Sequence, residues 1–258
     1  MVFEGIVIGK TPYKERDLIV KVLLRSGFLA SFYVYGGQGG GKHHKPSLFE
    51  FGSMMRIHIK DQGNRGVEKK ELMIVSEYER IWEPTAIRHN IKAFYLSCLY
   101  YEIILKFVVS YHPDHGELDQ EHAGIFNVLS NALFYLEKSL MDQSFESHQH
   151  LHVFLVKLLY HLGIMPDMDY CVYCGEDLLT SSGVHFLISE GQFSCLNCAP
   201  EKNDLGFLLR IKKAYQTKYQ HISEVHGTNV EEAEKLLSYF CHHFHVKMVD
   251  LKSYQLIL

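Results

Sequence analysis

The sequence has no apolar run long enough to span a bilayer, and residues 1–10 lack the pattern of a signal peptide. The most apolar helical stretch, residues 93–109, carries Glu102 and Lys106 and is shorter than the ~20 residues that a membrane helix needs. Residues 1–10 include Glu4 and two glycines, which interrupt the continuous apolar region of a signal peptide. With 47% hydrophobic and 22% charged residues, the chain has the composition of a folded globular protein. We expect a soluble, cytoplasmic protein.

The sequence also lacks the short motifs that mark common enzyme classes. It contains no P-loop, no dinucleotide fingerprint, no nucleophile elbow and no HExxH. Asp114, Glu117 and Asp119 follow Pro113 in a polar stretch, for which a solvated loop is the simpler interpretation. We therefore expect no enzymatic activity, with an unrecognised active site in the helical part of the chain as an alternative.

The formal net charge of −4 is divided unevenly along the chain. Residues 1–80 contain 13 Lys and Arg against 9 Asp and Glu, whereas residues 81–258 contain 13 against 21. Such an asymmetry suggests two domains with different partners. We predict two domains, at residues 1–80 and 81–258.

The first 80 residues have the short β-branched and aromatic runs of strands. Five strands are predicted, at residues 2–8, 18–24, 28–35, 54–59 and 71–76. Gly27 suits a hairpin turn between the second and third strands, and residues 36–47 form a long glycine-rich loop. This pattern favours a small OB-type barrel, which binds oligonucleotides on one face, and an SH3-like barrel fits nearly as well.

From Pro84 onward the apolar residues follow the period of helices. After a first helix near Ile87, helices are predicted at about 122–140, 148–162, 204–219 and 230–249. Gly163 should end the helix that precedes the cysteines. Thr228 and Glu231 have the spacing of a capping box at the start of the last helix. The second domain should therefore be mostly α-helical, giving an α+β multidomain protein.

Two CxxC pairs, 20 residues apart, carry the strongest chemical signal: Cys171 with Cys174 and Cys195 with Cys198. Two tight turns can present four thiolates to one tetrahedral zinc ion. Strands at 184–188 and 192–194 would bring the pairs together in a zinc-ribbon-like module at residues 168–200. We predict one structural Zn2+. Disulfides, free buried cysteines and a redox CxxC are the alternatives.

Cys241, His242, His243 and His245 form a second candidate cluster, which we interpret as surface and core residues because histidine is abundant in this chain. Cys98 and Cys241 are most simply core residues.

Basic and aromatic residues alternate in the first domain. Phosphates and unstacked bases require this mixture, although barrel surfaces often carry lysines and barrel cores carry aromatics. The candidate DNA-binding residues are Lys10, Tyr13, Lys14, Arg16, Lys21, Tyr35, Lys42 and Lys45.

The order of these features resembles that of the RecO family of bacterial recombination mediators along nearly the whole chain. Four segments carry the likeness: Gly5 to Ile8 followed by Tyr13, Glu15 and Leu18 to Val20; Ser26-Gly27 to Gly36-Gly37; Leu158 to Pro166 leading into Cys171; and Leu251 to Ser253 followed by Leu256 to Leu258. The resemblance implies an amino-terminal OB domain, a helical domain with a four-cysteine zinc module, and no catalytic turnover.

The resemblance also implies the partners of the protein. Members of the family bind single- and double-stranded DNA and anneal complementary strands. They also bind the tail of single-strand-binding protein and work with RecR to load RecA, which implies a nucleoid-associated bacterial protein. A zinc-stabilised protein-interaction adaptor is a further alternative.

The loop after the third strand departs from the family pattern. Its only permanent positive charges are Lys42 and Lys45, where relatives carry several. Because fewer counterions would be released, we expect DNA binding with a shallow salt dependence.

Overall fold

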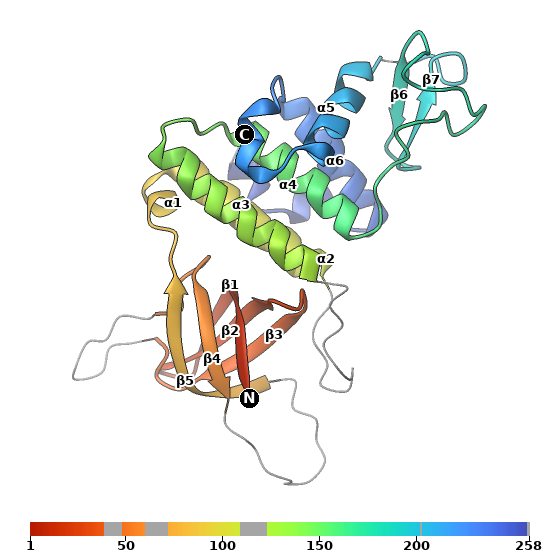
Figure 1. Ribbon diagram of the computed structural model, residues 1–258. Coiled ribbons are helices and arrows are strands. Elements are labelled where there is room, and N and C mark those ends of the chain that lie inside the picture. The colour runs from red at the N-terminus through yellow and green to blue at the C-terminus, as the bar shows by residue number, and fades with distance from the viewer. Residues whose placement is uncertain (39–47, 60–71, 109–122, 202, 257–258) are drawn as a thin grey trace. The chain divides into compact units, whose positions relative to one another are not determined.

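The computed structural model describes residues 1–38, 48–59, 72–108, 123–201 and 203–256 (Figure 1). The chain divides into two compact units, Met1–Glu137 and Lys138–Leu258. Among the described residues, no helix combines the length and the apolar composition needed to cross a membrane.

Five strands close into a barrel in the first unit (Figure 1). They are β1 (Val2–Tyr13), β2 (Asp17–Leu24), β3 (Leu29–Val34), β4 (Met54–Ile59) and β5 (Leu72–Trp82). Their order around the barrel is β1-β2-β3-β5-β4, and β3 pairs with β5 in parallel while the other pairs are antiparallel. This crossover favours the OB type over the SH3-like alternative and confirms the predicted fold class.

The barrel interior is filled by alternate residues of the strands, including Val7, Val20, Val22, Phe32 and Ile57. The predicted turn between β2 and β3 is present, with Gly27 at φ 88°. Two strands are longer than predicted, because β1 continues to Tyr13 and β5 to Trp82. Most residues of these extensions are exposed. Backbone pairing with β2 and β4 keeps the extensions in the sheet, and their sequences lack the alternating hydrophobic residues that would predict a strand.

Three helices follow the barrel: α1 (Ala86–His89), α2 (Ile91–Phe107) and α3 (Ala123–Met141). Tyr101 of α2 stacks on Phe51 with ring centroids 6.1 Å apart, and the guanidinium of Arg25 lies 5.5 Å from the ring centroid of Phe126 in α3. The first compact unit therefore includes α1, α2 and most of α3. The predicted boundary at residues 80/81 lies close to the change from strands to helices. That it separates two domains remains a prediction.

The second unit contains α4 (Ser147–His161), α5 (Leu205–Gln216) and α6 (Val230–His243), with the two-stranded sheet of β6 (Val184–Leu187) and β7 (Gln192–Cys195). Short 3-10 helices lie at η2 (Tyr219–Glu224), η3 (Met248–Asp250) and η4 (Tyr254–Leu256). Residues 149–156 of α4 are all buried, and α4 packs against both α5 and α6. The sequence of α4 therefore does not separate clearly into one polar face and one apolar face.

The ends of two helices can be compared with the predicted signals. Gly163 follows α4 with φ 71°, and its N–H donates to the carbonyl oxygen of Tyr160, as a terminating glycine should. The predicted capping box at Thr228 is wrong by one residue. The N-cap of α6 is Asn229, whose side-chain oxygen accepts a hydrogen bond from the N–H of Glu232 at 3.0 Å. Asparagine is a preferred N-cap residue and does not need the glutamate of a capping box.

Candidate metal centre and nucleic-acid interface

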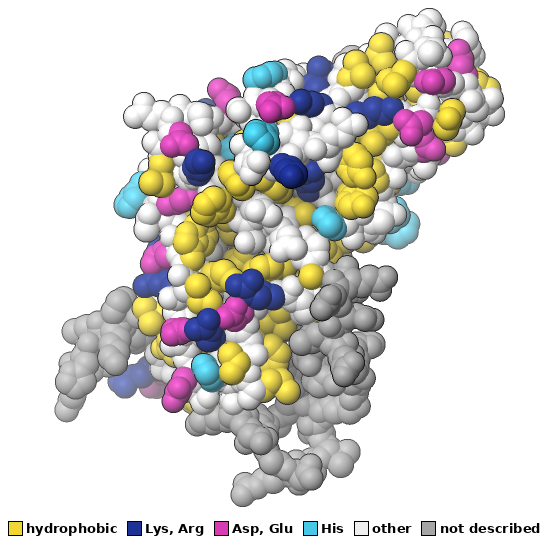
Figure 2. Space-filling model, in the orientation of Figure 1, with side chains coloured by type: hydrophobic (Ala, Val, Ile, Leu, Met, Phe, Trp, Pro, Cys, Tyr) yellow, Lys and Arg dark blue, Asp and Glu magenta, His cyan; other side chains and the backbone are white. Residues whose placement is uncertain are grey.

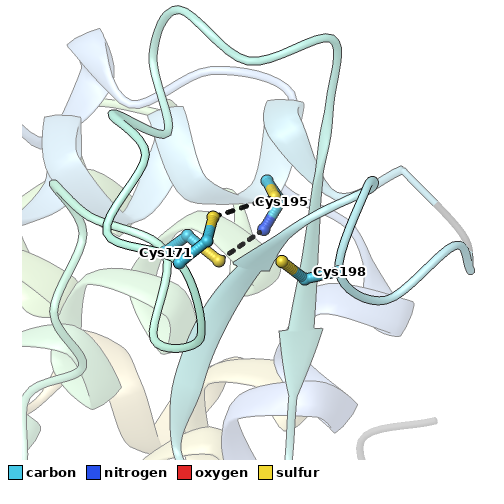
Figure 3. Close-up of side chains that lie close together, drawn as sticks. Cys171, Cys195 and Cys198 are labelled. Atoms are coloured by element: carbon cyan, nitrogen blue, oxygen red, sulfur yellow. Dashed lines mark hydrogen bonds between the residues drawn. The ribbon is translucent and has the colours of Figure 1, made fainter.

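The sulfur atoms of Cys171, Cys174, Cys195 and Cys198 all lie within 4.8 Å of one another. The Sγ atoms of Cys174 and Cys195 are 3.7 Å apart. Four sulfurs bound to one zinc ion at about 2.3 Å in a tetrahedron would be about 3.8 Å apart. The donor set and its spacing therefore fit a metal ion with four thiolate ligands. Figure 3 shows the labelled cysteines converging on one point.

Local backbone turns present the two cysteine pairs. After Cys171, the N–H of Gly175 donates to the carbonyl oxygen of Cys171 at 2.9 Å, and Gly175 has φ 75°. After Cys195, the N–H groups of Cys198 and Ala199 both donate to the carbonyl oxygen of Cys195 at 3.1 Å. Each CxxC thus folds into a tight turn, which is why two intervening residues are enough.

The antiparallel strands β6 and β7 bring the two turns together. Phe186 and Phe193 face each other with ring centroids 4.8 Å apart, and Phe186 also lies 5.6 Å from Phe207 of α5. At the turn, a Cβ on Gly191 would lie 2.3 Å from the ring of Tyr239 in α6. The predicted strand pair is confirmed, and aromatic side chains fix it to the helices of the second unit.

The thiols have opposed acid–base properties. Burial acts to raise the pKa of Cys171, but the N–H groups of Cys195, Cys174 and Tyr173 outweigh it and lower this pKa to about 6. Hydrogen bonding to Cys174 and Cys195 raises the pKa of Cys198 to about 12, and burial raises that of Cys195. The raised pKa values of Cys195 and Cys198 disfavour their thiolates, and a bound divalent cation is what stabilises four thiolates together.

The segment that carries the cysteines is acidic and exposes apolar side chains. Residues 158–201 contain six Asp and Glu and no Lys or Arg. Tyr170, Val172, Tyr173 and Leu179 are exposed there, and Figure 2 shows acidic and hydrophobic side chains together over the β6–β7 region. Zinc ribbons that grip nucleic acid need positive charge, which this segment lacks.

The remaining cysteines do not join this cluster. Cys241 is buried and Cys98 is half-buried, and burial raises the pKa of Cys98. Among the described residues, only the four cysteines form a group of three or more metal-binding side chains close enough to share an ion. We therefore keep the interpretation of the histidines near Cys241 as surface and core residues.

Several basic residues of the barrel are paired with carboxylates. The Nζ of Lys10 lies 2.9 Å from Glu50, and Arg25 and Arg56 both bind Glu4, at 2.6 and 2.8 Å. Hydrogen bonding from Arg56, with that from Arg25, lowers the pKa of Glu4. Figure 2 shows basic and acidic side chains side by side on the visible face of the barrel. Of the candidate DNA-binding residues, Lys10 thus has its charge largely offset.

Lys14, Arg16 and Lys21 are exposed, and none forms an ion pair with another described residue. Lys14 lies in the turn between β1 and β2 with φ 51°, and its Nζ lies 5.5 Å from the ring centroid of Tyr13. Tyr13 and Tyr35 are 43% and 59% exposed. Lys42 and Lys45 lie outside the described residues. The structure therefore places Tyr13 at the end of β1, Lys14 and Arg16 in the turn that follows, Lys21 in β2, and Tyr35 directly after β3.

Two residues of this surface are not among the candidate DNA-binding residues. Tyr33 lies between Tyr13 and Tyr35, and its hydroxyl donates to the carboxylate of Asp17. The charged residues Lys14, Glu15 and Arg16 directly precede Asp17, but nothing local indicates that Asp17 meets a tyrosine of the next strand. Only the pairing of β2 with β3 brings them together.

Comparisons with known proteins agree along the chain. A family model described as "Recombination protein O C terminal" matches residues 117–255. The DNA repair protein RecO of Leptospira biflexa is 22% identical over 254 residues, which cover 97% of this chain and 93% of that protein. The DNA repair protein RecO of Maridesulfovibrio salexigens is 26% identical over 196 residues, covering 76% and 72%. The corresponding protein of Thermodesulfovibrio yellowstonii is 25% identical over 196 residues, covering 76% and 69%.

The matched family model spans more than half of the chain, including both cysteine pairs and the helices α3 to α6. The full-length relative extends the likeness through the OB-type barrel. The chain therefore belongs to the recombination protein O (RecO) family of DNA repair proteins.

Proposed function

We propose that this protein is a non-enzymatic, DNA-binding recombination mediator. The observation that carries the proposal is the outer surface of β1, β2 and β3 with the turn between β1 and β2, which carries the exposed Tyr13 and Tyr35 together with the exposed Lys14, Arg16 and Lys21. OB-type barrels use this face and the turn between the first two strands to bind oligonucleotides. Membership of the RecO family supports the assignment.

In this proposal the barrel holds both single- and double-stranded DNA through its phosphates. Lys14, Arg16 and Lys21 supply charge that no carboxylate of the described residues pairs, and Lys42 and Lys45 of the glycine-rich loop add to it. Lys10 contributes less, because Glu50 already neutralises it. Tyr13 and Tyr35 stack on bases. Two strands held close with their phosphates partly neutralised can anneal, which requires no covalent chemistry.

The four cysteines hold one structural Zn2+. A tetrahedral site with four protein ligands leaves no open position for substrate or water, so the ion would stabilise the fold and take no part in a reaction. The acidic surface around it argues that DNA is bound by the barrel and not by this module. These roles agree with a protein that has no catalytic turnover.

We further propose that the second unit binds protein partners: the acidic tail of single-strand-binding protein and RecR, with which this protein would load RecA in the bacterial cytoplasm. Lys157 suits an acidic tail with an apolar end. Its Nζ lies 5.9 Å from the ring centroid of Tyr215, and Tyr215 in turn lies 5.1 Å from the exposed ring of Tyr160. Apolar surface beside one cation is the feature that such a peptide needs.

Fluorescence anisotropy with a labelled single-stranded oligonucleotide tests the DNA-binding part of the proposal. We expect saturable binding at low salt and a shallow fall of affinity as salt rises, because few phosphates are neutralised. Replacing Lys14, Arg16 and Lys21 together by alanine should reduce both the affinity and the salt slope. The matched control replaces three exposed helix lysines, Lys92, Lys106 and Lys138, and should change neither.

Failure of the unaltered protein to bind DNA at low salt would contradict the mediator proposal and favour the protein-interaction adaptor. Equal losses in the two triple variants would place the DNA elsewhere than on β1 to β3.

A further inference from the structure

Three tyrosine rings lie side by side on the barrel. Tyr13 is the last residue of β1, Tyr33 lies in β3, and Tyr35 directly follows β3. The ring centroids of Tyr13 and Tyr33 are 5.6 Å apart, and those of Tyr33 and Tyr35 are 4.7 Å apart. Both pairs are edge-on, with interplanar angles of 77° and 73°, a favoured arrangement for aromatic pairs. Tyr33 thus contacts both of the outer rings.

Asp17 fixes the central ring in place. The hydroxyl of Tyr33 donates to one oxygen of its carboxylate, and the N–H of Gly36 donates to the other at 2.9 Å. The side-chain amide of Gln38 donates to the carbonyl oxygen of Asp17 at 2.8 Å. One residue therefore ties the start of β2 to β3 and to the segment that carries Tyr35.

The two hydrogen bonds keep Asp17 charged and Tyr33 neutral. The hydroxyl of Tyr33 and the N–H of Gly36 lower the pKa of Asp17. The same carboxylate raises the pKa of Tyr33 to about 12. The bond between them thus persists across the physiological pH range.

The three rings differ in exposure. Tyr33 is only 7% exposed, whereas Tyr13 and Tyr35 are 43% and 59% exposed. Tyr33 is therefore the support, and the outer two rings are accessible to a ligand. An unpaired base can stack on an exposed ring, but a base inside a duplex already has both faces covered by its neighbours.

We propose that Tyr13 and Tyr35 are platforms for two unpaired bases, that Asp17 positions them through Tyr33, and that this arrangement makes the barrel prefer single strands to duplex DNA. The inference rests on the proposed DNA binding and specifies its substrate. Asp17 also places a negative charge near the ammonium group of Lys14. This negative charge weakens the attraction of the barrel for phosphates, which are present in both duplex and single-stranded DNA. Base stacking is then the interaction that distinguishes single strands from duplex.

The test compares the unaltered protein and its variants on a labelled oligothymidylate and on a labelled blunt-ended duplex of similar length. Tyr35→Ala should weaken oligothymidylate binding about tenfold, the usual effect of losing one stacked base. Duplex affinity and the salt slope should stay within about twofold, because no phosphate contact is lost. Tyr35→Phe keeps the ring and should restore the affinity for the oligothymidylate.

Asp17→Ala separates positioning from charge. If Asp17 acted only by its charge, removing it would strengthen binding of both DNAs. If it positions the rings, oligothymidylate binding should fall several-fold while duplex binding rises slightly. Tyr33→Phe, which removes only the hydroxyl, provides a second variant should Asp17→Ala fail to fold. It should weaken oligothymidylate binding alone. Fluorescence of Trp82, the single tryptophan and the last residue of β5, monitors folding of the barrel.

Equal affinity of the unaltered protein for the two DNAs, with no selective effect of the tyrosine variants, would overturn this inference and leave DNA binding itself in place. Absence of binding to either DNA would instead contradict the proposed function. A parallel rise in both affinities with Asp17→Ala would show that Asp17 acts by charge alone.

Discussion

The carboxylate of Glu137 in α3 accepts hydrogen bonds from both the backbone N–H and the hydroxyl of Thr85, at 2.9 and 3.0 Å. The same carboxylate accepts from the N–H groups of Ala86 and Ile87 at 2.7 and 2.9 Å. The N–H groups of Ala86 and Ile87 belong to the first turn of α1. N–H groups in the first turn of a helix have no hydrogen-bond acceptor within that helix. A buried side chain 52 residues away thus caps the helix that follows the barrel.

Replacing Glu137 by glutamine tests this cap. The amide keeps one acceptor oxygen but turns N–H groups toward backbone donors, so the unfolding free energy should fall by about 2 kcal/mol. The measurement is urea unfolding followed by Trp82 fluorescence. Glu77→Gln, at an exposed position of β5, is the control and should change stability by less than about 0.5 kcal/mol. Equal stabilities of the two variants would show that the cap contributes nothing.

The ion pair between Arg210 of α5 and Glu232 of α6 should be important for the second unit. The Nε of Arg210 lies 2.8 and 2.9 Å from the two oxygens of Glu232, which is only 4% exposed. Arg210→Ala leaves this carboxylate buried without its partner, which should cost about 3 to 5 kcal/mol. The double variant with Glu232→Leu should recover part of the loss. Chemical denaturation followed by circular dichroism compares them, and an additive double variant would contradict the pairing.

His150 and His152 predict a loss of stability in mild acid. Burial lowers the pKa of both imidazoles to about 4, whereas in the unfolded chain the pKa is about 6.5. Between these values the unfolded state binds more protons, so stability falls as the pH drops from about 6.5 toward 4. At pH 5 the loss should be about 2 kcal/mol for each histidine.

Denaturation midpoints at pH 7.5, 6 and 5 check this pH dependence. His152→Gln should make the decline shallower, and His242→Gln, at an exposed position, should leave it unchanged. If stability declined equally with pH in the unaltered protein and in both variants, groups other than His152 would be responsible for the effect.

The cysteine cluster predicts one zinc ion per chain by elemental analysis. Cys174→Ser should lose the metal and expose residues 171–198 to proteolysis, because the small core around Phe186 and Phe193 depends on it. DNA binding by the barrel should stay within about twofold of that of the unaltered protein. Cys98→Ser, outside the cluster, is the control and should retain zinc. A Cys174→Ser protein with normal zinc content and protease resistance would contradict the site.

Features with a local signature could be predicted from the sequence. The strands of the barrel follow from β-branched residues at alternate positions, such as Val20 and Val22. The cysteine cluster follows from two CxxC spacings, because each turn forms from four consecutive residues. Helix ends were predicted where one glycine decides them, as at Gly163.

Features that depend on residues distant in sequence could not be predicted. Lys10 and Glu50 are 40 residues apart, and Tyr33 and Asp17 are 16 apart. Neither pair has a signal in the sequence, because the residues meet only when the strands come together. The sequence alone therefore shows neither that Glu50 offsets the charge of Lys10 nor that Asp17 binds Tyr33. The association of α2 with the barrel likewise depends on Tyr101, which covers Gly52 so closely that a Cβ there would lie 2.4 Å from its hydroxyl oxygen.

Strand annealing by the purified protein tests the central claim most directly. Two complementary labelled oligonucleotides are mixed with and without the protein, at low salt, and duplex formation is followed by energy transfer. We expect the protein to accelerate annealing, and the variant lacking Lys14, Arg16 and Lys21 to lose most of that acceleration while the triple helix-lysine control retains it. An unaltered annealing rate with the folded, zinc-containing protein would contradict the assignment as a recombination mediator.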